Sequence, residues 1–238
     1  GALLEPLVKK GDHVKRGQKI GDADGFVSAP VHASVSGNVK AIEKVITPSG
    51  QKTLSIIIEA DEEDEVDFSL KPDKDISDLT PEDIRHIVRE AGIVGLGGAM
   101  FPTHVKLSVP EDKEVEYFVL NGIECEPFLN VDNRIMIERS SEVVAGMKLM
   151  MKAAGVKKGF IGIEDNKPRA ISNMKKAVEK EDNIEIKVFE TKYPQGGEKM
   201  LIKAALDREV PEGGLPLDVG VIVNNISTAV AVYEAIGE

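Results

Sequence analysis

The sequence predicts a protein of two folded parts: an all-β domain first, and then an open, mostly parallel α/β domain. Three observations predict this. Residues 1–60 have closely spaced glycines with β-branched residues between them, residues 61–79 fall in a dense acidic stretch, and helix and strand patterns alternate from residue 80 onward. We therefore expect an all-β domain over 1–60, an acidic linker over 61–79 and an α/β domain over 80–238.

The first 60 residues have the pattern of a compact all-β barrel. Val8, Val14 and Ile20 recur at a spacing of six residues, with turn glycines between them. The spacing V-x-x-G-D-x-V-x-x-G-Q-x-I, followed by A-P-V-x-A-x-x-S-G-x-V, resembles the lipoyl/biotinyl-type barrel-sandwich domain. Such domains carry a modified lysine at a hairpin tip, but the tip reads D-A-D-G here. We therefore expect a structural or docking role for this barrel and no swinging arm.

The charge of the chain is concentrated in one stretch. Residues 59–83 hold 12 acidic side chains and two lysines, a net charge of −10, whereas the other residues carry 28 basic and 29 acidic side chains. Because no basic excess is available to neutralise phosphates, the charge argues against a nucleic-acid binder. Like charges this dense repel one another, which favours a solvated linker or surface belt, with a partner-docking segment as the alternative.

Composition and residue spacing also argue against an internal disulfide, a metal site and a membrane span. Cys125 is the single cysteine, so an internal disulfide or a four-cysteine metal or iron–sulfur site within this chain is excluded. The histidines lack ligand spacing, and we expect no metal site. The chain has no run of about 18 apolar residues, so we expect no membrane span.

The α/β part begins with a helix-start signal. Thr80 can cap a helix, Pro81 suits its first position and Asp83 completes a capping-box pattern. Strands are then expected over 115–120, 160–163, 184–189 and 219–223. Helices are expected over 140–154, where Gly155 ends the helix, and over 168–180, 197–206 and 227–236. This alternation predicts a parallel sheet with helices on its faces.

Polar turns follow three of the expected strands, at residues 121–127 (NGIECEP), 193–199 (YPQGGEK) and 224–228 (NNIST). Open α/β sheets bind ligands beyond the carboxyl ends of their strands. A fourth candidate is the glycine-rich loop over 92–106, in which backbone amides can approach a ligand and Lys106 can neutralise a phosphate. This loop is not a dinucleotide fingerprint, because Met100 occupies the last glycine position and the loop follows a helix. Each turn alone is equally well an ordinary connection or cap, but together they predict a ligand site.

Five strings in this part carry a specific resemblance: GLGGAMFPTHVKL, NGIECEPFLNVDNRIMIER, YPQGGEKMLI, REVPEGGLP and VNNISTAVAVYEAI. They closely resemble the C subunit of Rnf-type electron transport complexes, and the resemblance extends from about residue 3 to the end. The α/β part is also similar to the NADH-oxidising flavoprotein subunit of respiratory complex I and to related quinone-reductase and cobalamin-reductase subunits. The resemblance implies a Rossmann-like open parallel α/β domain that binds FMN and takes NADH as its substrate.

The same resemblance implies which residues form the site. The FMN pocket would use Gly95, Gly97, Gly98, Lys106, Asn121, Tyr193, Gly196, Glu198, Asn224, Asn225 and Thr228. Lys106 and the asparagine turn would hold the FMN phosphate. Glu124 and Glu126 would face the nicotinamide, and Phe101 would stack on the dinucleotide. The chain departs from the relatives' pattern at Leu96, Met100, Ile123 and Gly197.

The implied function is electron entry into a membrane-bound ferredoxin:NAD oxidoreductase of the Rnf type. Hydride would pass between the nicotinamide and FMN, and single electrons would pass to 4Fe-4S clusters in a ferredoxin-like domain that we expect outside this chain. The partners would be other subunits of an ion-translocating complex, with ferredoxin as an indirect partner, on the cytoplasmic face of the membrane. Two alternatives stay open: a cobalamin-reductase-type flavoprotein, and a docking or scaffold module that has lost flavin binding.

Overall fold

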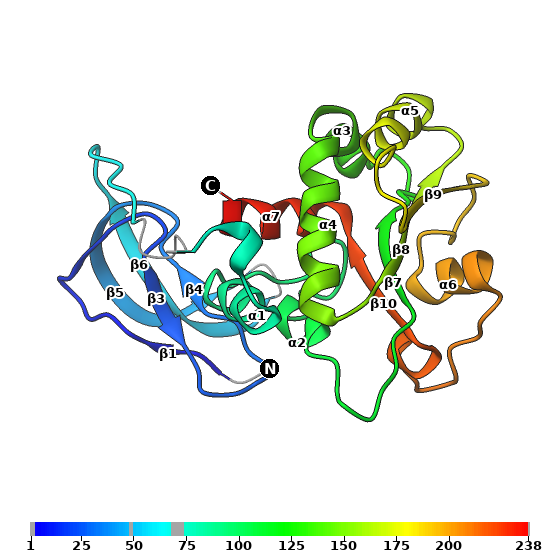
Figure 1. The fold of residues 1–238 in the computed structure, drawn as a ribbon. Helices are drawn as coiled ribbons and strands as arrows, with labels where there is room; N and C mark the ends of the chain where they lie inside the picture. Colours follow the sequence, from blue (N-terminus) through cyan, green and yellow to red (C-terminus); the bar gives the residue numbers. More distant parts are fainter. Residues whose placement is uncertain (1–2, 48–49, 68–73, 238) are drawn as a thin grey trace. The chain divides into compact units, whose positions relative to one another are not determined.

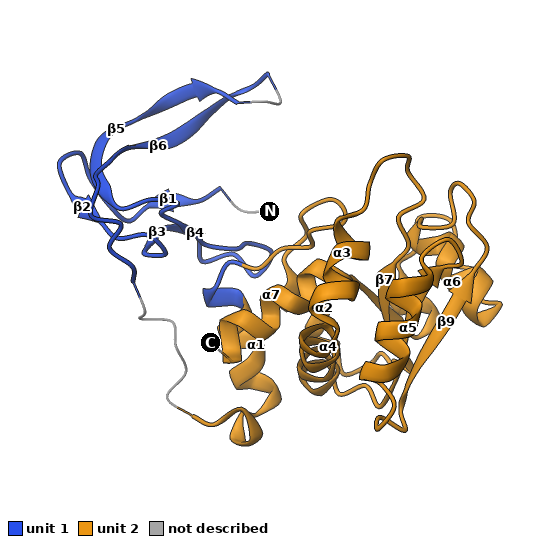
Figure 2. Cartoon of the chain, turned by 90° about the horizontal axis from the view of Figure 1, so that it is seen from above, with its two compact units in different colours: residues 1–72, 89–92 blue, residues 73–88, 93–238 orange. Residues whose placement is uncertain are grey.

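The structure, a computed structural model, describes residues 3–47, 50–67 and 74–237. These residues fold as two compact units (Figure 2). The first unit covers the described residues of 1–72 and 89–92, and the second covers those of 73–88 and 93–238. Among the described residues, no helix is long and apolar enough to cross a membrane. Residues 68–73 of the expected acidic linker lie outside the described part of the chain.

The described part of the first unit consists of four short and two long antiparallel strands (Figure 1). The strands are β1 (Glu5–Pro6), β2 (His13–Val14), β3 (Lys19–Asp22), β4 (Val31–His32), β5 (Gly37–Ile46) and β6 (Lys52–Ala60). They form sheets of order β1-β3-β4 and β2-β5-β6. Val14, Ile20 and Val39 are buried between these strands, and Val8 packs against them. The six-residue spacing of apolar side chains therefore supplies the core of an all-β unit, as predicted.

Acidic side chains at the start of the expected linker pair with cations of the same unit. Arg16 donates to the Asp64 carboxylate over 2.9 Å, and the Lys15 ammonium lies 3.1 Å from the Glu65 carboxylate. The backbone of this segment also bonds to Arg16, whose amide donates to the Glu65 carbonyl oxygen over 2.8 Å. Residues 61–67 thus lie along the barrel strands of their own unit.

The second unit is built on a parallel sheet. Its strands are β7 (Tyr117–Gly122), β8 (Lys158–Glu164), β9 (Ile184–Phe189) and β10 (Val221–Asn225), in the order β10-β7-β8-β9. The helices are α1 (Pro81–Glu90, whose last two residues belong to the first unit), α2 (Thr103–Leu107), α3 (Val131–Glu138), α4 (Ser140–Ala154), α5 (Pro168–Ala177), α6 (Glu198–Leu206) and α7 (Ile226–Gly237), with short 3-10 turns at Ile76–Asp78 and Pro216–Val219. The predicted mostly parallel sheet is confirmed.

Both faces of this sheet are covered by helices, as Figure 1 shows with α4 and α6 on opposite sides of the strands. Val119, Phe160 and Val223 pack with Leu201 of α6 on one face. On the other face, a Cβ atom at Gly159 would lie 2.4 Å from the Met147 side chain of α4. Burial on both faces explains why the strands read as nearly continuous apolar runs.

Most expected elements are present, with boundaries shifted by a few residues. The capping box at α1 is confirmed: the Asp83 amide donates to the Thr80 hydroxyl over 3.1 Å, and the Thr80 amide donates to the Asp83 carboxylate over 2.8 Å. The helix over 140–154 and the strand over 184–189 have the predicted bounds. The strands expected over 115–120 and 219–223 each begin and end two residues later, at 117–122 and 221–225. The helix expected over 168–180 ends at 177, and α2 and α3 are additional.

Candidate functional site

The candidate site lies where the chain reverses its direction across the sheet. From β7 the chain proceeds outward through β8 and β9, and it then returns to place β10 on the other side of β7. Parallel pairing places Asn225 of β10 directly beside Asn121 of β7, at the carboxyl ends of both strands. Ligands of open α/β sheets bind at such a switch point.

Lys106, at the end of the glycine-rich loop, points to this edge of the sheet. Its ammonium group donates to the Val223 carbonyl oxygen over 2.9 Å and lies 3.1 Å from the Glu198 carboxylate at the start of α6. An ammonium group has three N–H donors, so one donor without a partner among the described residues is available to a ligand. The loop, strand β10 and helix α6 therefore meet at the predicted cation.

Two more predicted residues join the β7 end to the turn before α6. The Asn121 side-chain amide donates to the Gly196 carbonyl oxygen over 2.8 Å. A Cβ atom at Gly196 would lie 2.8 Å from the Ile123 carbonyl oxygen and 3.1 Å from the Cys125 sulfur. Only glycine fits this approach, and Cys125 is half-buried there as an acceptor for the Gly196 amide at 3.4 Å.

The glycine-rich loop also packs on the start of α7. The Leu96 amide donates to the buried Thr228 hydroxyl over 3.1 Å. A Cβ atom at Gly97 would lie 2.7 Å from the Asn225 side-chain nitrogen, so the loop backbone lies directly on that amide. The predicted residues Gly97, Asn225 and Thr228 are thus brought together.

Asn224 has the buried donor that a polar ligand would use. Its side chain is 5% exposed, and its Nδ2 has no hydrogen-bond partner among the described residues. An unpartnered buried donor costs roughly 1–3 kcal/mol. Asn225 differs, because its Oδ1 accepts the Ser227 amide over 2.7 Å at the start of α7 and its Nδ2 donates to Asp132 over 2.6 Å.

The two glutamates predicted at the nicotinamide side have different surroundings. Both carboxylate oxygens of Glu124 accept amide hydrogens at the start of α3, from Asp132 over 2.9 Å and from Asn133 over 3.0 Å. Glu126 is exposed in the same turn. Glu124 therefore has a structural role, and its role at the nicotinamide side stays a prediction, whereas Glu126 faces solvent.

The remaining predicted residues lie on exposed loops. Tyr193 is 72% exposed and Phe101 is 40% exposed. Phe101 is anchored through its carbonyl oxygen, which accepts the Gly95 amide over 2.9 Å. An added methyl at Gly98 would meet no described heavy atom within 4 Å, which leaves open space on this side of the loop.

Two residues at this edge were missed by sequence reasoning. Asp132 accepts hydrogen bonds from Asn225 and, over 2.7 Å, from the Ser227 hydroxyl. Glu164, the last residue of β8, is fully buried, and neither carboxylate oxygen has a hydrogen-bond partner among the described residues. Burial raises the pKa of the Glu164 carboxyl. The strand-end position of Glu164 was a signal for this edge, whereas nothing local marks Asp132.

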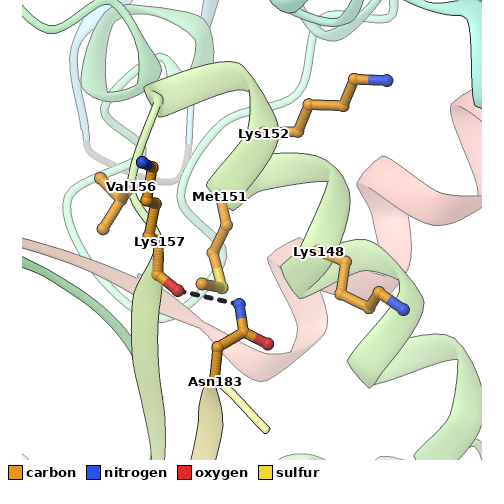
Figure 3. A pocket seen from close by; sticks show the side chains of 6 residues that line it. All are labelled: Lys148, Met151, Lys152, Val156, Lys157 and Asn183. Atoms are coloured by element: carbon orange, nitrogen blue, oxygen red, sulfur yellow. Dashed lines mark hydrogen bonds between the residues drawn. The ribbon is translucent and has the colours of Figure 1, made fainter. Parts of the chain in front are cut away.

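A separate hollow of about 470 Å³ lies at the opposite edge of the sheet (Figure 3). Its lining comes from α4 and from the residues just before β8 and β9: Lys148, Met151, Lys152, Val156, Lys157 and Asn183. The Asn183 side chain donates to the Lys157 carbonyl oxygen over 2.8 Å. Because α/β ligands bind at the carboxyl edge, this hollow at the amino edge is not the predicted site.

Comparisons with known proteins identify two family domains in this chain. Residues 88–234 match the family described as the Nuo51 FMN-binding domain, and residues 1–63 match the RnfC barrel sandwich hybrid domain. The chain is 26% identical to a chain of a NAD+-reducing [NiFe]-hydrogenase in the H2-reduced state, with a TM-score of 0.57 over 66% of this chain and 31% of that chain.

Curated relatives match over almost the whole sequence. The C subunit of the Na(+)-translocating ferredoxin:NAD(+) oxidoreductase complex of Acetobacterium woodii is 52% identical over 99% of this chain and 53% of its own length. The C subunit of the proton-translocating complex of Clostridium ljungdahlii is 50% identical over 99% of this chain and 51% of its own length. The chain thus spans about half the length of these relatives. It belongs to the family of the Nuo51 FMN-binding domain, preceded by an RnfC barrel sandwich hybrid domain, and is a homologue of the C subunits of ion-translocating oxidoreductase complexes.

Proposed function

We propose that this chain is the electron-entry part of a ferredoxin:NAD oxidoreductase subunit of the Rnf type, which exchanges hydride between NAD(H) and bound FMN. The observation that carries the proposal is the convergence at the β7–β10 switch point. Three separate segments meet there at one edge of the sheet: the glycine-rich loop with Gly97 and Lys106, the end of β7 with Asn121, and the start of α7 with Thr228. FMN, when bound, would supply hydride exchange with the nicotinamide and single-electron exchange with iron–sulfur clusters.

The residues present fit an anionic, polar cofactor. Lys106 offers its remaining N–H donor, and the amino end of α6 adds backbone amides and the positive end of a helix dipole. The buried Asn224 side-chain nitrogen offers a donor that the described residues leave unpaired. The glycine-rich loop lets backbone approach the ligand closely. These groups would bind and orient the cofactor, and no nucleophilic side chain is needed.

Exposed residues around these FMN-binding groups would form the nicotinamide side of the site. Phe101 offers an exposed ring for stacking, the space beside Gly98 admits a second ligand, and Glu126 offers a carboxylate for ribose hydroxyls. Binding energy there would position the dinucleotide against the flavin.

The full-length protein would pass electrons to 4Fe-4S clusters in a further domain and would assemble with other subunits of a membrane complex, with ferredoxin as an indirect partner. The names of the relatives support this assembly, since they are subunits of ferredoxin:NAD(+) oxidoreductase complexes. The chain would then lie peripherally on the cytoplasmic face of the membrane. The barrel would comprise residues 1–60, the linker residues 61–79 and the cofactor domain residues 80–238.

Reconstitution tests the proposal. The purified chain is incubated with FMN and gel-filtered, and NADH is then added in the absence of oxygen. Retained flavin that loses its visible absorbance supports the proposed function. Failure to retain FMN over a range of reconstitution conditions contradicts it and supports a docking or scaffold module.

A further inference from the structure

Asp132 is a buried residue whose carboxylate bonds to side chains at the end of β10 and at the start of α7. Its side chain is 9% exposed and belongs to the second residue of α3. One carboxylate oxygen accepts the Asn225 side-chain amide over 2.6 Å, and the other accepts the Ser227 hydroxyl over 2.7 Å. A carboxylate accommodates burial when hydrogen bonds replace its hydration, and both oxygens have such a bond here.

These contacts fix which way the Asn225 amide faces. Its nitrogen is directed to Asp132, so its oxygen must be directed to the first turn of α7, where it accepts the Ser227 amide over 2.7 Å. The Gly97 backbone then packs on the same amide group, where an added Cβ atom would lie 2.7 Å from the nitrogen. Asn225 therefore holds the glycine-rich loop and the start of α7 in one arrangement, and Asp132 determines its orientation.

The position of Asp132 itself is set from the β7 turn. Glu124 accepts the Asp132 and Asn133 amides at 2.9 and 3.0 Å and so caps α3 in place of its own N-cap residue. A continuous series of contacts thus connects the end of β7 to the glycine-rich loop, through Glu124, Asp132, Asn225 and Gly97.

We propose that Asp132 is a positioning residue for the proposed FMN site. It holds the Asn225 amide and the Ser227 hydroxyl in the orientation that aligns the glycine-rich loop with the end of β10. The inference rests on the proposed FMN site. Asp132 need not touch the flavin, since it acts through Asn225 and through the first turn of α7.

Two substitutions of Asp132 separate positioning from charge and from stability. Asp132→Ala removes both acceptors, and we expect the dissociation constant for FMN, measured by quenching of flavin fluorescence, to rise about tenfold or more. Asp132→Asn can still accept from Asn225 through its amide oxygen and donate to the Ser227 oxygen. It should therefore retain FMN affinity within about threefold. Both measurements are made well below the melting temperature of each apoprotein, so that a loss of global stability does not change the result.

The matched control is Asp218→Ala, which removes another carboxylate of the same unit, before the amino end of β10. Asp218 accepts the Leu215 amide over 2.9 Å and pairs with the Lys113 ammonium over 2.9 Å, so it too bonds a loop. FMN affinity should be unchanged in this variant. If Asp132→Ala does not fold, Ser227→Ala removes one of the two contacts and should weaken FMN binding by roughly threefold.

The outcomes distinguish this inference from the proposed function. Wild-type protein that does not bind FMN contradicts the proposed function. Wild-type protein that binds FMN, together with a folded Asp132→Ala variant of unchanged affinity, overturns the positioning role alone. An Asp132→Asn variant as weak as Asp132→Ala also overturns it, because charge and not orientation would then be the cause.

Discussion

The ammonium group of Lys106 lies 3.1 Å from a carboxylate oxygen of Glu198, a residue 92 positions away in the sequence. This ion pair, together with the bond to the Val223 carbonyl oxygen, holds the lysine at the edge of the sheet before any ligand is bound. Such preorganisation lowers the entropic cost of binding an anionic group.

Lys106→Ala should therefore weaken FMN binding. A charge-assisted hydrogen bond contributes about 1.5–3 kcal/mol, so we expect the dissociation constant to rise roughly 10- to 100-fold. Fluorescence titration with FMN measures this change. The matched control is Lys113→Ala, which removes a lysine paired with Asp218 over 2.9 Å on another part of the same unit. Equal FMN affinity in wild type and Lys106→Ala would remove Lys106 from the site.

The sequence predicts elements well where their end signals are local. Helix α4 has its predicted bounds because Gly155 ends it in the left-handed conformation, with φ of 70°, and because apolar residues repeat along it. Helix α3 was missed because its amino end is capped by Glu124, a residue of the preceding turn, whereas Asn130 at the N-cap position makes no side-chain cap bond among the described residues.

The residues of the candidate site also divide into those that a local pattern marks and those that only long-range contacts place. Strand-end turns and glycines mark the edge of the sheet, and parallel register then places Asn121 beside Asn225. The contact between Asp132 and Asn225 joins residues 93 positions apart, and no local pattern encodes it. Sequence reasoning therefore predicted residues that the structure brings to one edge of the sheet, but it did not find the residues that orient their side chains.

Gly146→Ala should destabilise the α/β unit. An added Cβ atom would lie 1.9 Å from the Ala229 carbonyl oxygen, where α4 crosses α7, so the two helices must separate. Overpacking of this kind costs typically 1–3 kcal/mol and exceeds the gain of about 1 kcal/mol in helix propensity. Urea unfolding measures the change. Gly98→Ala is the control: its methyl would meet no described atom within 4 Å, and its free energy of unfolding should stay within about 0.5 kcal/mol of wild type. A Gly146→Ala variant as stable as wild type would contradict this close crossing.

Asp22 should contribute to the acid stability of the barrel unit. Burial opposes its ionisation, but hydrogen bonds from Arg89, from the Ala23 amide and from Lys19 outweigh burial and lower the pKa of Asp22 to about 2, from an ordinary value of 3.8. A lowered pKa means that the unfolded chain binds the proton more tightly. The stabilisation is therefore complete above pH 3.8 and is lost as the pH falls through about 2.

The measurement compares the melting temperature of wild type and Asp22→Asn across this acidic range. The difference between the two proteins should be largest above pH 3.8 and should shrink toward pH 2. Other carboxylates titrate in both proteins and cancel in the comparison. A difference that stays constant with pH would show that the contribution of Asp22 does not depend on its charge.

Glu164 should have the opposite pH dependence. Its burial, the largest influence, raises the pKa of its carboxyl, and the nearby charges of Glu124 and Asp165 act in the same direction, whereas the Lys167 charge opposes them. The folded protein then binds the proton more tightly than the unfolded chain. Ionisation of Glu164 therefore lowers stability as the pH rises from its ordinary value of 4.5 through the raised value.

Glu164→Gln keeps the shape of the side chain and removes this titration. Relative to wild type, the variant should be more stable at pH 8 than it is below pH 4.5, where Glu164 is protonated in both states. Melting temperatures measured across this range test the prediction, with Glu190→Gln as the control, since Glu190 follows β9 with a side chain that is 74% exposed. A pH-independent difference between wild type and Glu164→Gln would contradict the prediction, because it would mean that the Glu164 carboxyl has the same pKa in the folded and the unfolded chain.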